Sequence, residues 1–119
     1  MKIWVGVIAL LCVCVCWVAP ADAQSASERM DNLMGLYMVR ASEFLCGFKM
    51  TEEQRVEVLK ASRFLEGKLE LSSEKIDVLY RKVVKSMEAQ KASGLCDTDG
   101  EWAIAFQEAV ENFARSETP

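Results

Sequence analysis

Proline is absent from the whole stretch between Pro20 and Pro119, so no residue of that stretch is barred from a helix interior. Within it the apolar residues recur at intervals of three and four, which is the period of an amphipathic helix. No alternation of apolar and polar residues, the pattern of a half-buried strand, competes with that period. The sequence therefore predicts an all-α fold.

The N-terminal segment has the pattern of an export signal. Lys2 supplies a positive start, residues 3–18 are uncharged and almost wholly apolar, and Ala21 and Ala23 form the small-x-small pattern at which signal peptidase cuts. The apolar run is shorter than the roughly 20 residues that a membrane-spanning helix requires. We therefore expect residues 1–23 to be a cleaved signal peptide, with no stable membrane span after cleavage.

Cleavage would leave residues 24–119 as one exported domain, in a periplasm or outside the cell. The two cysteines in this part are Cys46 and Cys96. In an oxidising compartment an even pair of cysteines forms a disulfide, whereas a metal site would need further ligands and the chain has no histidine. A bridge here closes a loop of about 50 residues, which the chain-entropy model values at roughly 4 kcal/mol.

Four helices are predicted, and together they would form a small four-helix bundle stapled by the disulfide. Three of them begin at capping signals in which a Ser or Thr precedes a Glu or Gln by three residues, and Ser72 caps the other. Glycines are expected to end the first three. The two middle helices should form a hairpin inside the disulfide loop. The predicted helices span about 28–46, 52–66, 73–92 and 99–115, with start signals at Ser25–Glu28, Thr51–Gln54, Ser72 and Thr98–Glu101, and stops at Gly47, Gly67 and Gly94.

Several function classes lack their usual residues. Without histidine the chain has no Ser-His or Cys-His nucleophile pair, and it has no glycine-rich phosphate loop. Its carboxylate pairs lie at predicted helix starts, where capping explains them. The net charge of −4 argues against a nucleic-acid partner, because phosphate binding needs a basic patch. We expect a non-catalytic protein without a cofactor.

Three methionines, Met30, Met34 and Met38, form a row at four-residue spacing. Four-residue spacing places their thioethers along one face of a helix. Thioether clusters suit Cu(I), so periplasmic copper handling through this row is one alternative function. The other interpretation is that the methionines fill irregular core space or give an adaptable binding surface.

The first predicted helix carries more apolar residues than one face can hold. Its apolar residues include Met30, Leu33, Met34, Leu36, Tyr37, Met38 and Val39. Such a helix either lies at the centre of the fold or exposes an apolar patch. An exposed patch would bind a protein or peptide partner, or a second copy of the chain, and this is the function we expect. The predicted contact residues are Leu33, Met34, Tyr37 and Met38.

The arrangement of the two cysteines is similar to that in the periplasmic acid-stress chaperones of the HdeA type. The similarity lies in Leu95–Cys96–Asp97–Thr98–Asp99 with a helix after it. It implies a small exported helical protein, tied by one disulfide, that opens at low pH to bind unfolded chains. In that family the first cysteine lies at the start of a helix, whereas Cys46 is predicted to end one. Acid-stress chaperoning is therefore an alternative function, and the chain is not assigned to the family.

Overall fold

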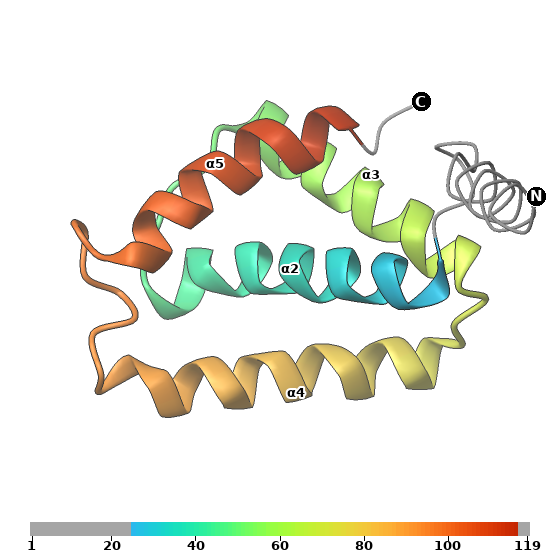
Figure 1. Ribbon diagram of the computed structural model, residues 1–119, viewed down its shortest axis with the longest axis horizontal. Coiled ribbons are helices and arrows are strands. Elements are labelled where there is room, and N and C mark those ends of the chain that lie inside the picture. Colours follow the sequence, from blue (N-terminus) through green and yellow to red (C-terminus); the bar gives the residue numbers. More distant parts are fainter. Residues whose placement is uncertain (1–24, 117–119) are drawn as a thin grey trace, which may run out of the picture.

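Four helices make up the described part of the chain. The computed structural model describes residues 25–116, with side chains given as far as Asn112. The helices are α2 (Ala26–Leu45), α3 (Glu52–Lys68), α4 (Ser73–Lys91) and α5 (Glu101–Ser116), shown in Figure 1. The fold is thus an all-α four-helix domain, as predicted. The proposed signal peptide, residues 1–23, lies outside the described part.

Helices α2, α3 and α4 begin at the predicted caps. The Ser25 hydroxyl accepts a hydrogen bond from the Glu28 N–H at 3.1 Å, and Ser72 caps α4 in the same way. Thr51 makes the full reciprocal box, because the Gln54 side chain also accepts from the Thr51 N–H at 2.9 Å. Each cap satisfies a backbone donor that the first turn leaves without a partner within the helix.

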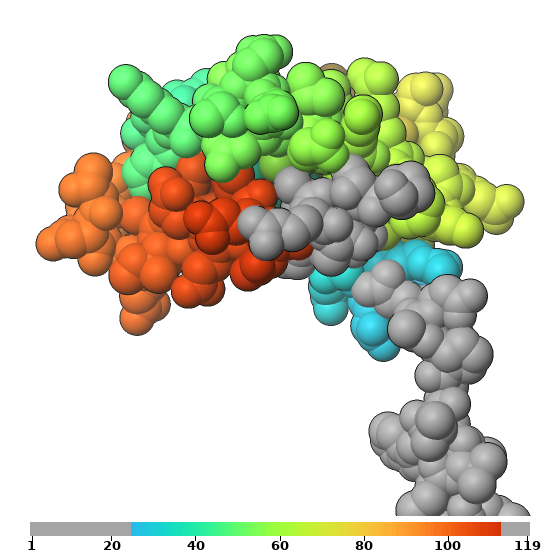
Figure 2. Space-filling model, turned by 90° about the horizontal axis from the view of Figure 1, so that it is seen from above, coloured from blue at the N-terminus to red at the C-terminus, as the bar shows by residue number. Residues whose placement is uncertain are grey.

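Helix α2 is the central element of the fold. It packs against α3, α4 and α5, while α3 also packs against α5. Figure 1 shows α4 on one side of α2 with α3 and α5 on the other, and Figure 2 shows α5 and α3 next to each other over that second side. The surplus of apolar residues on α2 is therefore explained by contacts on several faces. Its buried residues are Leu33, Leu36, Tyr37, Val39, Ala41 and Ser42.

The expected hairpin between the two middle helices is wrong. Helices α3 and α4 lie on different sides of α2, and their main packing partners are α2 and, for α3, α5. The physical reason is that α2 offers apolar surface in several directions, so each neighbour buries more by packing on α2. The core accordingly combines α2 with Val58, Ala61 and Leu65 of α3, Leu79, Val83 and Met87 of α4, and Phe106 and Val110 of α5.

Two helix ends differ from the prediction. Helix α3 does not stop at Gly67 but continues to Lys68, and Glu70 takes the left-handed conformation with φ 52°. The Leu71 N–H then donates to the Glu66 carbonyl and the Glu70 N–H to the Gly67 carbonyl, which is the Schellman pattern. The reason is that Leu69 and Leu71 pack against the core and so draw the chain into this turn.

The start of α5 is also later than predicted. Thr98 was expected to cap this helix. The first residue of α5 is instead Glu101, and the Ile104 N–H donates to the Gly100 carbonyl. Residues 97–100 instead make a tight turn, in which the Gly100 N–H donates to the Asp97 carbonyl at 3.0 Å. This turn delays the helix because it carries the chain from the disulfide to α5.

Substituting Glu70 by glycine should stabilise the domain. A non-glycine residue in the left-handed region costs roughly 1–2 kcal/mol, which a glycine would avoid. Part of this gain in stability is offset by the greater conformational freedom of glycine in the unfolded chain. We expect Glu70→Gly to raise the free energy of unfolding by about 0.5–1 kcal/mol in urea denaturation. Gly94→Ala is the control of opposite sign, since Gly94 has φ 92° and a Cβ there would lie 2.8 Å from Oδ2 of Asp97. A Glu70→Gly variant less stable than the wild type would contradict this account of the turn.

The predicted disulfide joins Cys46 to Cys96, with their Cα atoms 5.0 Å apart. Cys46 is the C-cap of α2 and Cys96 lies in the connection between α4 and α5. Gly47 follows in the left-handed conformation with φ 71°, as predicted. The bridge thus ties the approach to α5 to the end of the central helix.

Both tyrosines of the chain lie where α2, α3 and α4 meet. The rings of Tyr37 and Tyr80 pack edge to face with centroids 5.5 Å apart, and the Arg40 guanidinium lies over both. The Tyr37 hydroxyl donates to Oε2 of Glu66 at 2.6 Å. Burial, together with the hydrogen bond and negative charge of Glu66, raises the pKa of Tyr37 far above its ordinary value. Burial also raises the pKa of Tyr80, although Arg40 opposes it.

These raised pKa values predict a loss of stability at alkaline pH. The unfolded tyrosines release their protons near pH 10, before the folded ones do. The contribution of the two tyrosines to the free energy of unfolding is therefore complete below about pH 10. It is lost as the pH rises toward their pKa values in the folded protein. Urea unfolding at a series of pH values should show this loss, and a Tyr37→Phe/Tyr80→Phe variant should lose less stability over the same range. An equal loss in that variant would show that the tyrosines are not its source.

Candidate functional site

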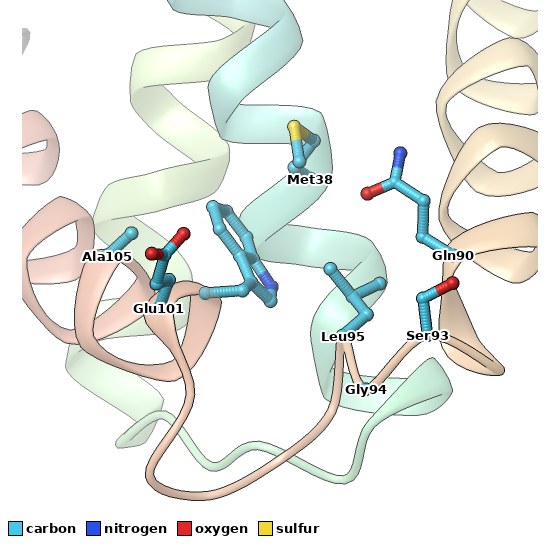
Figure 3. A pocket seen from close by; sticks show the side chains of 8 residues that line it. Met38, Gln90, Ser93, Gly94, Leu95, Glu101 and Ala105 are labelled. Atoms are coloured by element: carbon cyan, nitrogen blue, oxygen red, sulfur yellow. The ribbon is translucent and has the colours of Figure 1, made fainter.

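A pocket of about 560 Å³ lies between the end of α4 and the start of α5. Its apolar lining comes from α2, α5 and the connection before α5, while its polar lining includes a residue of α4. Figure 3 shows Glu101 and Ala105 on one side of the hollow and Gln90 and Ser93 on the other, with Met38 and Leu95 between them. We call it the Trp102 pocket, lined by Met38, Gln90, Ser93, Gly94, Leu95, Glu101, Trp102 and Ala105.

A single buried hydroxyl fixes the indole of Trp102. Nε1 of Trp102 donates to Oγ of Ser42 at 2.8 Å, and Ser42 in turn donates to the Met38 carbonyl at 2.7 Å. Ser42 is fully buried in α2, whereas Trp102 is partly exposed. The polar atom of the indole is thus satisfied on the protein side. This hydrogen bond holds a large apolar ring in a defined position in the pocket wall.

Removing that hydroxyl should destabilise the domain and disturb the pocket. In Ser42→Ala the Trp102 N–H loses its acceptor, and an unsatisfied buried donor costs about 1–3 kcal/mol. Urea denaturation should show this loss, and the emission of Trp102 should change in the folded state. Ser62→Ala is the matched control, because Ser62 is equally buried but its hydroxyl only donates to the Val58 carbonyl of its own helix. Equal losses of unfolding free energy in the two variants would show that the hydrogen bond from the Trp102 indole contributes nothing to stability.

A second hollow of about 210 Å³ lies between α2 and α4. Met38 lines both, so the two hollows meet at this side chain. We call the second one the methionine cavity, lined by Met34, Met38, Lys82, Val83, Ser86 and Met87.

The four predicted contact residues occupy two different environments. Leu33 and Tyr37 have no exposed surface and belong to the core. Met34 and Met38 are partly exposed and line the two hollows. Of these four residues, only the two methionines are therefore open to a partner in this conformation. Met30, the third member of the methionine row, is partly buried against the core and is not among the residues that line either hollow.

The Trp102 pocket has few ionisable or nucleophilic side chains in its lining. Its lining holds one carboxylate, Glu101, and one hydroxyl, Ser93, with no second acid or base beside them. Among residues 25–116 no group of three His, Cys, Asp or Glu side chains is placed to hold a metal ion. No helix in the same part of the chain is long and apolar enough to cross a membrane. What the arrangement offers is an apolar wall with a polar edge.

Sequence reasoning did not identify Trp102 as a site residue. Its hydrogen-bond partner Ser42 is 60 residues away in the sequence, so the local pattern gives no indication of this contact. One signal was present, since Trp102 is the only tryptophan outside the N-terminal apolar segment. Leu95, next to Cys96, gave no signal of its own, and the fold places it in the pocket wall.

Comparison of the chain with protein-family models, with curated proteins and with solved structures found no match.

Proposed function

We propose that this protein is a small exported, non-catalytic binding protein that holds an apolar segment of another protein against the Trp102 pocket. The observation that carries the proposal is the fixed indole of Trp102 in an open, largely apolar hollow. Tryptophan is one of the residues enriched among the few that dominate the energy of protein recognition. Export is supported by the N-terminal pattern and by the disulfide, which persists in oxidising compartments.

The shape of the site favours a chain segment over a compact ligand. The Trp102 pocket and the methionine cavity meet at Met38, so the apolar surface extends along α2 beside α4. An apolar helix or strand could lay successive side chains into the two hollows. Methionine side chains adapt to different partners because they are flexible and polarisable. The polar groups of Gln90, Ser93 and Glu101 are placed to meet polar groups of the segment at the edge.

Photo-crosslinking in an exporting host tests the proposal. A photoreactive phenylalanine derivative at position 105 would lie in the pocket, and the same residue in place of the exposed Arg63 on α3 is the matched control. We expect an adduct with another protein from position 105 and none from position 63. The adduct should disappear when Leu95→Glu is added, because a carboxylate would enter the apolar wall. No adduct at position 105, equal adducts at both positions, or an adduct with a second copy of this chain would each overturn the proposal.

The HdeA-like alternative makes a different prediction. An acid-stress chaperone of this kind would lose its helical packing at low pH and bind unfolded chains in that state. Near-ultraviolet circular dichroism, which reports the packing around Trp102, would reveal such a transition near pH 2. A near-ultraviolet spectrum at that pH equal to the neutral one would exclude this alternative and leave the proposed function unaffected.

A further inference from the structure

Three methionines from two helices line one cavity. Met34 and Met38 come from α2 and Met87 comes from α4, and all three border the methionine cavity of about 210 Å³. The sequence row had grouped Met30 with the first two, but the packing of α4 on α2 brings Met87 to them instead. The three methionines at the cavity therefore come from two helices, and not from one row on a single helix.

We propose that Met34, Met38 and Met87 form a binding site for one soft monovalent cation, Cu(I). Thioether sulfurs are soft, uncharged ligands that select Cu(I) over Zn(II) and the harder divalent ions. Three donors meeting at one cavity fit this class of ion better than a single surface methionine does. The inference rests on the three methionines that line the cavity, and it does not require a bound partner segment, which would enter the same cavity.

The exposure of the three residues suits a site that an ion can enter. Met87 is 1% exposed and would form the inner wall, whereas Met34 and Met38 are partly exposed and would form the entrance. Val83 contributes apolar lining, which limits competition from water. Lys82 also borders the cavity, but it is exposed, so its ammonium group can stay in water while its stem packs at the rim.

Thioether ligands have a further consequence for the pH dependence of binding. Cysteine, histidine and carboxylate sites lose metal as the pH falls, because their ligands take up protons. Thioethers carry no proton to lose or gain in this range. We therefore expect binding to be nearly unchanged between neutral and mildly acidic pH, which a site built from other ligands would not show.

Silver(I) is the first probe, because it is a soft monovalent ion and needs no reductant that would open the Cys46–Cys96 bridge. The protein is taken from the exported fraction of an expression host with its methionine methyl groups labelled with ¹³C. We expect one Ag(I) per chain in native mass spectrometry, with micromolar or tighter affinity. The methyl resonances of Met34, Met38 and Met87 should shift together, and Zn(II) should leave them unchanged. Anaerobic Cu(I) should displace the silver.

Leucine variants separate the site from the rest of the core. Met→Leu substitutions nearly conserve volume, so Met34→Leu and Met87→Leu are expected to fold while weakening Ag(I) binding at least tenfold. Met50→Leu is the control, because Met50 is buried in the core and is not among the residues that line the cavity. Absence of methyl shifts in the wild type, or equal affinity in all three variants, would overturn the proposal. If Met87→Leu fails to fold, the partly exposed Met34 gives the decisive variant.

Discussion

Replacing Cys46 and Cys96 together by alanine should lower the free energy of unfolding by about 4 kcal/mol. The bridge closes a loop of 50 residues, so its removal returns a large amount of conformational freedom to the unfolded chain. Small domains are stable by only about 5–15 kcal/mol in total, so a loss of this size would leave a marginal fold. Urea denaturation of the oxidised wild type and the double variant measures the difference.

Reduction of the wild type provides the control for that experiment. Reduced wild type and the double variant should unfold at similar urea concentrations, because both lack the cross-link. A double variant within about 1 kcal/mol of the oxidised protein would contradict the account, since a disulfide typically contributes about 2–4 kcal/mol. Loss of the bridge should also loosen the connection that carries Leu95 into the Trp102 pocket.

Leu36→Ala is expected to cost about 2–5 kcal/mol, as for other large-to-small changes in a packed core. Leu36 is fully buried in the central helix, so its truncation leaves a cavity among the helices that pack on α2. Phe44→Ala is the matched control on the same helix. Phe44 is larger but 62% exposed, and its truncation should change stability by less than about 0.5 kcal/mol. Urea denaturation of both variants checks the contrast, and similar losses would contradict the central position of α2.

The helices could be predicted from the sequence because their determinants are local. Thr51 and Gln54 cap each other across three residues, and Gly94 ends α4 with φ 92° because its position needs a left-handed residue. The disulfide could be predicted because two cysteines remain after the expected signal peptide and because an exported protein meets an oxidising compartment. None of these predictions depends on which helices pack against each other.

The arrangement of the helices could not be predicted in the same way. An apolar surplus on the first helix was compatible with a central position or with an exposed patch, and only packing distinguishes the two. Because α2 is central, Leu33 and Tyr37 became core residues, while Met34 and Met38 remained at the surface. The left-handed Glu70 was also unforeseen, since nothing in its residue type favours that conformation.

The candidate site was the least predictable part. Its walls come from α2, α4, α5 and the connection before α5, and its organising contact joins Ser42 to Trp102 over 60 residues. Periodicity assigns each of these residues to a helix face but does not bring the faces together. The methionine row contains two of the three thioethers at the cavity, whereas Met87 belongs to another helix and reaches the cavity only through the packing of α4 on α2.

Native mass spectrometry of the exported protein, purified without reducing agent, tests the central claim most directly. The wild type should carry a second, different polypeptide, and its own mass should be lower by two hydrogen atoms because the disulfide is formed. Ala105→Arg, which places a positive charge in the wall of the Trp102 pocket where an apolar segment would bind, should keep the disulfide and lose the partner. A bare monomer in both samples, or a partner retained by Ala105→Arg, would contradict the claim that this pocket holds an apolar segment of another protein.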